Sequence, residues 1–198
     1  MRAFIAIDLP VAIRAALREK QQAFRAACPA ASWTRPEGIH LTLKFLGEIS
    51  EAQVKQVSDA LSVLERFEAF EIGVQGFGFF PDARHPRVFW AGLQAPPALP
   101  ELAARVETAL ESLGFPREQR PFTPHLTLAR FKIPRSQAAL QKLLEQGEET
   151  VREPPLLGRF AVSEFFLFES KLSPHGAEYI KVARFPRDQG LPSMKDKG

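Results

Sequence analysis

Cysteine is almost absent from this sequence of 198 residues, because Cys28 is the only one. A single thiol excludes an internal disulfide framework and a zinc site built from several cysteines. The sequence also lacks a run of about 20 apolar residues, which a membrane-spanning helix requires. The apolar stretch near the amino terminus is interrupted by Asp8, so we expect neither a signal peptide nor a membrane partner. These absences predict a soluble, cytoplasmic protein.

Nucleotide-binding loops of the common kinds are missing too. No glycine-rich loop ends in Gly-Lys-Ser, and no helix is expected to follow the glycines at Gly76 and Gly78. These two glycines lie in a predicted strand, where they indicate a bulge or a close backbone approach. Function therefore has to be sought in other residues.

Phenylalanine, in contrast, is abundant, with 17 residues against one tyrosine and two tryptophans, which predicts a phenylalanine-rich core. Apolar residues make up 45% of the chain and charged residues 25%, a composition typical of globular proteins. The net charge of +3 permits a polyanionic partner without requiring one, because acidic and basic residues are interspersed. The length fits one compact domain or two small fused lobes.

Hydrophobic patterning and turn residues predict alternating strands and helices. Strands are expected at residues 2–8, 39–45, 70–80, 88–93, 124–131, 159–168 and 178–185. Helices are expected at 11–28, from Ser50 to about 66, from about 100 to about 113, and at 136–146. Residues 188–198 read as a polar tail.

The chain repeats itself at an offset of 85 residues. His40-Leu-Thr-Leu matches His125-Leu-Thr-Leu, the Arg-Pro pair at 35–36 matches the pair at 120–121, and residues 4–7 match residues 89–92. Both copies lie in the same order of predicted strands and helices. We therefore predict a single domain at 1–187, made of two lobes with repeat halves at about 1–83 and 84–187 that face each other across a pseudo-twofold axis.

The repeated motif places a histidine and a threonine on one face of a strand. Side chains alternate along a strand, so His40 and Thr42 share one face while the two leucines face the core, and His125 and Thr127 repeat this pattern. A twofold axis would bring two imidazoles, each beside a hydroxyl, to one groove. In-line cleavage of a phosphodiester needs a base and an acid on opposite sides of phosphorus, and two imidazoles suit both tasks without a metal.

Two simpler origins of the motif stay open. A single histidine two residues before a threonine is most often a hydrogen-bonded surface pair, and two copies can be relics of duplication. The histidine and threonine side chains are not expected to pack in the core. Duplication alone therefore does not explain why both halves keep these two residues. A metal site is a further alternative, but no His-Glu-x-x-His motif or acidic cluster accompanies either histidine.

The two motifs, in the stretches His40-Leu-Thr-Leu-Lys-Phe-Leu-Gly47 and Pro124-His-Leu-Thr-Leu-Ala-Arg130, resemble those of the 2H phosphoesterase superfamily. Residues 1–7, 79–81 and 87–92 resemble its RNA 2′,3′-cyclic phosphodiesterase branch, also called 2′-5′ RNA ligase, and the similarity extends to about residue 186. The resemblance implies a bilobed α+β fold, with antiparallel sheets lining a central cleft and helices outside. It implies hydrolysis of RNA 2′,3′-cyclic phosphate ends to 2′-phosphomonoesters without a cofactor, and ATP-independent 2′-5′ ligation in reverse.

The resemblance also implies roles for five residues. His40 would donate a proton to the departing ribose 3′-oxygen, and His125 would accept one from water. Thr42 and Thr127 would donate to phosphate oxygens. Arg130 would contact phosphate or ribose, although strict alternation places it on the leucine face, so a bulge or a strand end is required. The implied partner is an RNA with a cyclic phosphate end, for example one derived from tRNA, and the expected state is a monomer.

Further polar residues near the motifs have weaker claims. Lys44 shares the His40 face by parity, which suggests a phosphate contact or, more often, a solvated strand end. The symmetric arginines Arg35 and Arg120 are expected at the rim of the cleft or simply on the surface. His85 and His175 are expected in turns, with a structural role or simply exposed to solvent, and Tyr179 is a candidate for stacking on a base.

Three rival functions remain. The first changes the substrate to a cyclic phosphate on ADP-ribose or to a 2′-5′-linked oligonucleotide. The second is a non-catalytic module that binds RNA ends through the two His-x-Thr pairs. The third is a metal-dependent hydrolase. Substrate comparison, product analysis and a chelator separate these from the leading interpretation.

Overall fold

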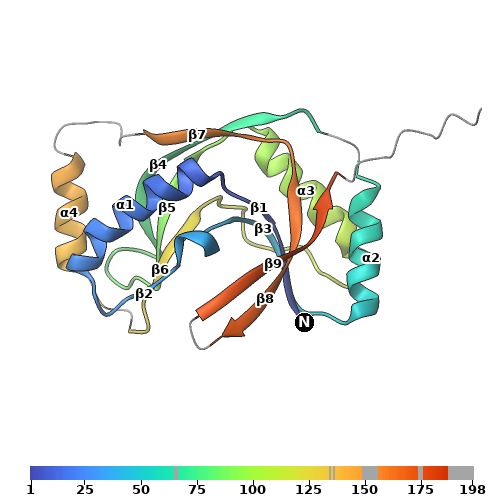
Figure 1. The fold of residues 1–198 in the computed structure, drawn as a ribbon, viewed down its shortest axis with the longest axis horizontal. Coiled ribbons are helices and arrows are strands. Elements are labelled where there is room, and N and C mark those ends of the chain that lie inside the picture. The colour runs from blue at the N-terminus through green and yellow to red at the C-terminus, as the bar shows by residue number, and fades with distance from the viewer. Residues whose placement is uncertain (65–66, 134, 136, 149–155, 174–175, 187–198) are drawn as a thin grey trace, which may run out of the picture.

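The computed structural model describes residues 1–64, 67–133, 135, 137–148, 156–173 and 176–186. It contains four α-helices and a curled antiparallel sheet (Figure 1). The helices are α1 (Val11–Ala27), α2 (Glu51–Ser62), α3 (Ala98–Glu111) and α4 (Ala138–Glu148), with a 3-10 turn η1 at Pro36–Gly38. The strands are β1 (Arg2–Ile7), β2 (Ser32–Trp33), β3 (Leu41–Glu48), β4 (Phe70–Phe80), β5 (Val88–Gln94), β6 (Leu126–Arg130), β7 (Leu156–Val162), β8 (Phe165–Ser173) and β9 (Gly176–Phe185). The α+β prediction is confirmed.

The sheet runs in the order β7-β4-β5-β6-β3-β1-β8-β9, and β2 pairs with β6. Its two middle strands, β6 and β3, are the ones that follow the two histidines. The strands on either side of this centre come from both sequence halves, because β4 of the first half pairs with β5, and β8 of the second half pairs with β1. The proposed halves at 1–83 and 84–187 therefore each contribute strands to both ends of the sheet.

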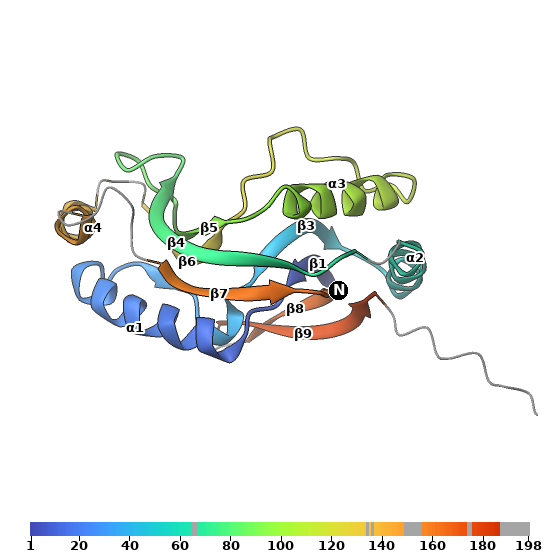
Figure 2. The same ribbon diagram turned by 90° about the horizontal axis from the view of Figure 1, so that it is seen from above.

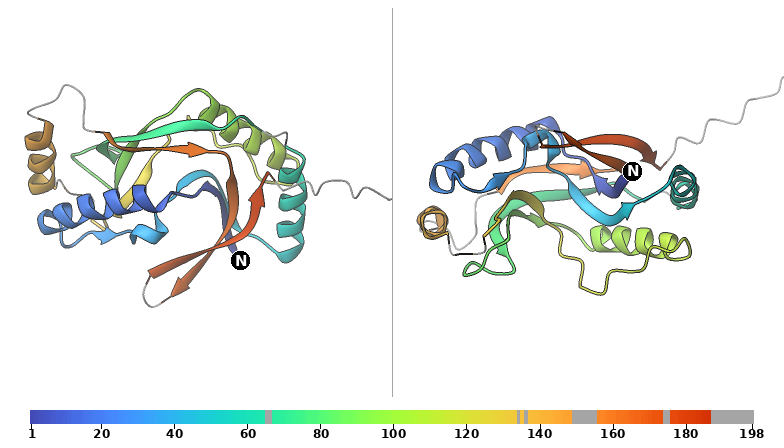
Figure 3. Two further views of the ribbon diagram at one scale, coloured as in Figure 1. Left: turned by 45° about the horizontal axis from the view of Figure 1, so that its top comes forward. Right: turned by 90° about the horizontal axis from the view of Figure 1, so that it is seen from below.

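The helices form two groups at opposite ends of the molecule. Helix α1 contacts β7 and α4, whereas α3 contacts α2 and β3. Figures 2 and 3 show α1 and α3 on opposite sides of the strands. The buried face of α1 carries Ile13, Leu17 and Phe24. These residues are four and seven positions apart, which places them on the same side of a helix.

Local sequence accounts for the helix ends. The Ser50 side chain accepts a hydrogen bond from the backbone N–H of Gln53, whose side chain accepts one from the backbone N–H of Ser50, forming a capping box that starts α2. Just beyond the end of α3, Gly114 adopts a φ of +87°, a conformation that favours glycine. Both devices satisfy backbone groups that a helix end leaves unpaired.

Two boundary predictions are wrong. The expected strand 159–168 is two strands, β7 and β8, interrupted at Ser163 and Glu164, because β7 pairs with β4 while β8 pairs with β1 near the other end of the sheet. The helix expected to reach residue 66 ends at Ser62. The short β2 and the turn η1 were not predicted. Ser136, the first residue of the helix expected at 136–146, and the tail at 188–198 lie outside the described residues.

The predicted match between residues 4–7 and 89–92 is wrong by one position. Ala6 pairs with Thr42 in β3, whereas Trp90 pairs with Thr127 in β6, so the equivalent residues of β1 and β5 differ by 84 and not by 85. A shift of one residue exchanges the two faces of a strand. Consequently Phe4 belongs to the small cluster under the histidine face, while Phe89 is fully buried in the main core.

Candidate active site

The two repeated motifs meet at the centre of the sheet. Leu41 of β3 is paired with Leu126 of β6, so the residue after each histidine contacts its counterpart across antiparallel strands. Both leucines are fully buried, while Thr42 and Thr127 are half-buried on the opposite face. The structure thus brings the two motifs together in the symmetric arrangement that the repeat predicts.

His40 lies in an aromatic environment. Its ring stacks on Phe4 with centroids 4.5 Å apart and meets the edge of Tyr179 at 4.9 Å. Phe168 stacks on Phe4 with centroids 5.2 Å apart, and its ring also lies 6.2 Å from that of His40. Since β1, β8 and β9 supply these rings, the imidazole is held by strands far from it in sequence.

His125 has a different set of neighbours. The ring meets Phe80 edge to face, with centroids 4.9 Å apart. Phe80 in turn contacts Trp90, whose indole covers Gly78 so closely that a Cβ at that glycine would lie 2.3 Å from the ring. In the part of the chain that the structure describes, the buried indole N–H of Trp90 has no acceptor. Aromatic packing therefore supports both histidines, but with different residues.

Both imidazoles are anchored in the same way. Nδ1 of His40 lies 2.8 Å from the carbonyl oxygen of Gly38, and Nδ1 of His125 lies 2.8 Å from that of Thr123. A carbonyl oxygen only accepts hydrogen bonds, so Nδ1 carries the proton in each ring. The neutral tautomer therefore leaves Nε2 of both histidines as a proton acceptor.

The two histidines titrate below the usual range for the residue. Burial lowers the pKa of His40 to about 4, although the hydrogen bond to Gly38 and the nearby charge of Asp8 oppose this shift. Burial also lowers the pKa of His125, and the positive charge of Arg130 acts in the same direction. Both imidazoles are therefore neutral at pH 7 in the free protein. Binding of an anion would favour their protonated forms.

Each central strand contains a bulge just after the threonine of its motif. The extra residue reverses which face the following side chains occupy. Leu128 is the extra residue in β6, because Trp90 pairs with Thr127 and Phe89 with Ala129. Arg130 consequently leaves the leucine face, and its charge reaches both His40 and His125. The structure supplies the bulge that the assignment of Arg130 required.

The matching bulge in β3 overturns both expectations for Lys44. Leu43 is the extra residue here, since Ala6 pairs with Thr42 and Ile5 pairs with Lys44. Lys44 is buried, forms an ion pair with Glu107 of α3 and donates to the carbonyl oxygen of Pro116 at 2.8 Å. It therefore lies neither at a solvated strand end nor beside the substrate face.

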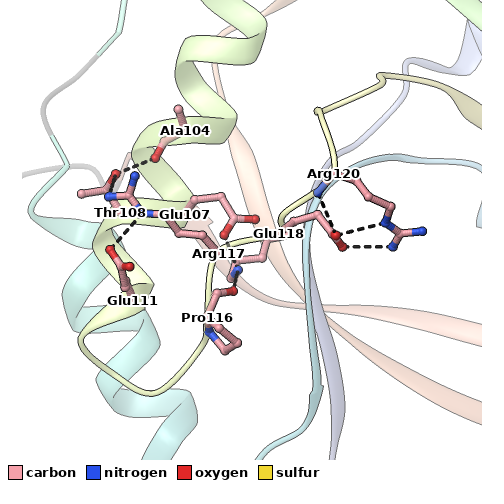
Figure 4. A network of polar contacts seen from close by, with 9 residues as sticks. Ala104, Glu107, Thr108, Glu111, Pro116, Arg117, Glu118 and Arg120 are labelled. Carbon is pink, nitrogen blue, oxygen red and sulfur yellow. Dashed lines mark hydrogen bonds and ion pairs between the residues drawn. The ribbon is translucent and has the colours of Figure 1, made fainter.

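The loop that leads from α3 to the second histidine carries several charged pairs (Figure 4). Arg120 donates to both carboxylate oxygens of Glu118 at 3.0 and 3.1 Å, and Arg117 pairs with Glu111 at 2.9 Å. Arg120 and its symmetric counterpart Arg35 are exposed. Both arginines lie in the segments that precede the two histidines.

The remaining candidates differ in position. His85 is exposed in a turn held by the Asp82 carboxylate, which accepts from its backbone N–H at 2.9 Å. Tyr179 belongs to the His40 site through the edge contact given above. His175 lies outside the described residues.

A pocket of about 330 Å³ adjoins His40, and the sequence did not predict it. Besides His40 it is lined by Asp8, Arg14, Glu37, Phe168, Tyr179 and Lys181. Lys181 pairs with Asp8 at 2.5 Å, and Arg14 also pairs with Asp8 while donating to the carbonyl oxygen of Leu9 at 2.7 Å. In the sequence Asp8 only interrupts an apolar stretch, and no local pattern indicates a site there, because Arg14 and Lys181 meet at this carboxylate only in the fold.

The Asp8 carboxylate is ionised at neutral pH. Burial raises the pKa of this group, but hydrogen bonds and charge from Lys181 and Arg14 outweigh that effect and lower it overall. The resulting negative charge favours the protonated form of the neighbouring His40. Among the described residues, no acidic side chain is a cause of the shift in the pKa of His125.

Within the described ranges, no three side chains of histidine, cysteine, aspartate or glutamate form a group that could hold a metal ion. Within the same ranges, every helix is too short or too polar to cross a membrane.

Known proteins resemble this chain over most of its length. Residues 7–90 and 93–179 match the family described as LigT like Phosphoesterase, and each segment contains one His-Leu-Thr-Leu motif. The RNA 2′,3′-cyclic phosphodiesterase of Methanothermobacter thermautotrophicus is 32% identical over 186 residues, which are 93% of this chain and 98% of that protein. The protein of the same name from Thermus thermophilus is 36% identical, over 93% of this chain and 89% of that protein.

Solved structures are similar as well. The protein TT0787 of Thermus thermophilus superposes with a TM-score of 0.75 at 33% identity, covering 93% of this chain and 97% of that one. E. coli LigT complexed with 3′-AMP gives a TM-score of 0.70 at 31% identity, covering 93% of this chain and 96% of that one.

Proposed function

Because the chain belongs to the family of LigT-like phosphoesterases, we propose that it hydrolyses 2′,3′-cyclic phosphate ends of RNA to 2′-phosphomonoesters. Relatives named RNA 2′,3′-cyclic phosphodiesterase support this substrate. The observation that carries the proposal is the pairing of the two motifs at Leu41 and Leu126, with identically anchored histidines on either side.

The reaction follows from two imidazoles that flank one phosphate. Nε2 of His125 takes a proton from a water molecule as the water oxygen bonds to phosphorus. The bond between phosphorus and the ribose 3′-oxygen breaks on the opposite side, and His40 protonates the departing oxygen. The product carries a free 3′-hydroxyl and a 2′-phosphate.

Both threonines and Arg130 have positions that suit the phosphate. Each threonine hydroxyl lies on the histidine face of its strand and is available to donate to a non-bridging oxygen. Arg130 supplies a positive charge that is sensed at both histidines. These groups would stabilise negative charge as it redistributes among the phosphate oxygens in the transition state.

The proton that His40 donates has to be taken up with the substrate. His40 is neutral in the free protein at pH 7, because burial holds its pKa at about 4. The charge of a bound cyclic phosphate raises that pKa, and the Asp8 carboxylate acts in the same direction. Asp8 therefore supports the donor role for His40 over His125.

Ligation follows from the same geometry. When an RNA 5′-hydroxyl takes the place of water, its attack on phosphorus opens the ring and leaves a 2′-5′ linkage, without ATP. We expect a monomer that acts on RNA ends such as those derived from tRNA.

The decisive experiment uses a short RNA with a 2′,3′-cyclic phosphate end, incubated with purified protein and excess chelator. A product that gains one water by mass and loses phosphate to phosphatase supports the proposal. Parallel reactions with ADP-ribose cyclic phosphate and with a 2′-5′-linked oligonucleotide identify the rival substrates. An RNA end that binds but stays unreacted would instead indicate a binding module.

His40→Ala and His125→Ala provide the matched variants for this assay, and His85→Ala is the control because that histidine is exposed in a turn. Removal of a positioned acid or base lowers turnover by about 10²–10⁴-fold. Unchanged turnover in both active-site variants would refute the two-histidine mechanism.

A further inference from the structure

Phe45 is the only exposed residue among the phenylalanines, tryptophans and tyrosine of the molecule. All 17 phenylalanines, both tryptophans and the single tyrosine lie in described residues, and each of the others is buried or half-buried. Phe45 is 67% exposed, whereas every other large exposed apolar side chain of the described residues is aliphatic. A single exposed apolar side chain is ordinary on a folded surface, so the position of this ring relative to the two motifs decides its meaning.

The ring lies on the active-site face of β3. The bulge at Leu43 turns Lys44 into the core, so Phe45 returns to the face that carries Thr42. Across the strands it pairs with Phe4 of β1, with ring centroids 6.3 Å apart. Phe4 in turn stacks under His40. An aromatic row therefore extends from the histidine outward to Phe45.

The repeat adds a second observation. Arg130 occupies the position in β6 that Phe45 occupies in β3, since each follows its histidine by five residues and comes just after the equivalent bulge. One copy of the duplicated position carries a cation, and the other carries an exposed aromatic ring. A nucleotide chain presents the two complementary features, a phosphate and a base with a flat π-face.

We propose that Phe45 stacks on a nucleobase of the RNA, that of the nucleotide preceding the cyclic phosphate end. This inference rests on the proposed function. Phe45 lies three positions beyond Thr42, so it is up to about 10 Å along β3 from the threonine that would face the reacting phosphate. The terminal nucleoside carries the cyclic phosphate and therefore has to lie beside the two histidines. The base that reaches Phe45 then belongs to the preceding nucleotide.

Stacking on an aromatic side chain is tolerant of base identity, because every base has a π-face. Phe45 would thus strengthen binding of many RNA ends without selecting one sequence. It would also favour an RNA strand over a free nucleoside cyclic phosphate, which has no preceding base.

The test compares two substrates, a mononucleoside 2′,3′-cyclic phosphate and a trinucleotide with the same end. We expect Phe45→Ala to raise KM for the trinucleotide by roughly 5- to 100-fold and to leave the mononucleoside reaction unchanged. With a trinucleotide that lacks the penultimate base, the wild-type protein should show the same raised KM that Phe45→Ala shows with the complete trinucleotide. Phe45→Trp should retain the trinucleotide KM, while Phe45→Leu should not.

Val63→Ala is the matched control, because Val63 is 78% exposed at the end of α2 and has no place in the aromatic row. An unchanged trinucleotide KM in Phe45→Ala, or an equal loss on both substrates, would overturn the stacking role. Binding of a 2′-phosphate trinucleotide, measured by fluorescence anisotropy, separates the two proposals. If the wild-type protein binds the trinucleotide but does not hydrolyse the cyclic end, the catalytic proposal fails. Weaker binding by Phe45→Ala would still support stacking in that case. Equal binding by the wild type and Phe45→Ala would overturn stacking.

Discussion

Lys44 of β3 forms a buried ion pair with Glu107 of α3 and also donates to the carbonyl oxygen of Pro116. The strand that follows the first histidine is thereby fastened to the loop that leads to the second. Because the lysine belongs to one copy of the motif and its partners lie just before the other, this contact helps to hold the two copies in register.

Removal of this lysine should destabilise the protein. Lys44→Ala leaves the Glu107 carboxylate without its partner in a poorly solvated position, so we expect a loss of about 2–4 kcal/mol in the free energy of unfolding. Denaturant titration measures it. Lys55→Ala is the control, since Lys55 is 82% exposed in its pair with Asp59, and its loss should stay below about 0.5 kcal/mol. Equal effects of the two substitutions would contradict the structural role of Lys44.

Gly78 and Trp90 form a complementary pair that a double-mutant cycle can test. Gly78→Ala places a Cβ 2.3 Å from the indole, so we expect a loss of about 1–3 kcal/mol in unfolding free energy. Combined with Trp90→Val, which removes the overlapping ring, the same alanine should cost much less than it does alone. Strict additivity of the two substitutions would show that the indole does not set the requirement for glycine.

Stability should fall in mild acid because of His40. Its pKa is about 4 in the folded protein against 6.5 for the unperturbed group, so between these pH values the unfolded chain binds a proton that the folded protein does not. Lowering the pH from 6.5 to 4 therefore removes stability, on the order of 2–3 kcal/mol from this residue.

The measurement for that prediction is the free energy of unfolding across this pH range. His40→Gln should reduce the loss, whereas His85→Gln, which changes an exposed turn, should retain it. If the unfolding free energy of His40→Gln fell with pH as steeply as that of the wild type, other groups would be the cause of the acid sensitivity.

Asp8 offers a way to distinguish the two histidines. The rate should depend on pH as a bell, since one imidazole has to be protonated and the other neutral. Asp8→Asn removes the negative charge that favours protonated His40, so the pKa of His40 falls further. If His40 is the donor, the alkaline limb of the kcat profile moves to lower pH while the acidic limb stays in place.

A shift confined to the acidic limb would instead make His40 the base. Asp59→Asn, which removes an exposed carboxylate of α2, should leave both limbs unchanged. Because both limbs are read from one profile, the comparison does not depend on the absolute rate of the variant.

Sequence by itself predicted the residues of the candidate site and determined much of the fold. The repeated His-Leu-Thr-Leu motif identified two matching strands, because alternation along a strand follows from backbone geometry alone. Capping residues such as Ser50 and the apolar spacing of α1 predicted helices from contacts between near neighbours in the chain.

Only the tertiary structure decided which face several residues occupy. The bulges at Leu43 and Leu128 depend on pairing with β1 and β5, and they turn Lys44 inward and carry Phe45 and Arg130 to the face of Thr42 and Thr127. One extra residue reverses the alternation, and hydrophobic patterning along the strand does not locate it because the cause lies in a neighbouring strand.

The same limit applies to the surroundings of His40. Tyr179, Phe168 and Lys181 come from β8 and β9, more than 120 residues away in the chain, and they reach the histidine because β8 pairs with β1. Local patterning identifies a strand and its faces, but the order of strands in the sheet depends on which buried surfaces fit together. That order decides the burial, charge and aromatic contacts on which the two histidines depend.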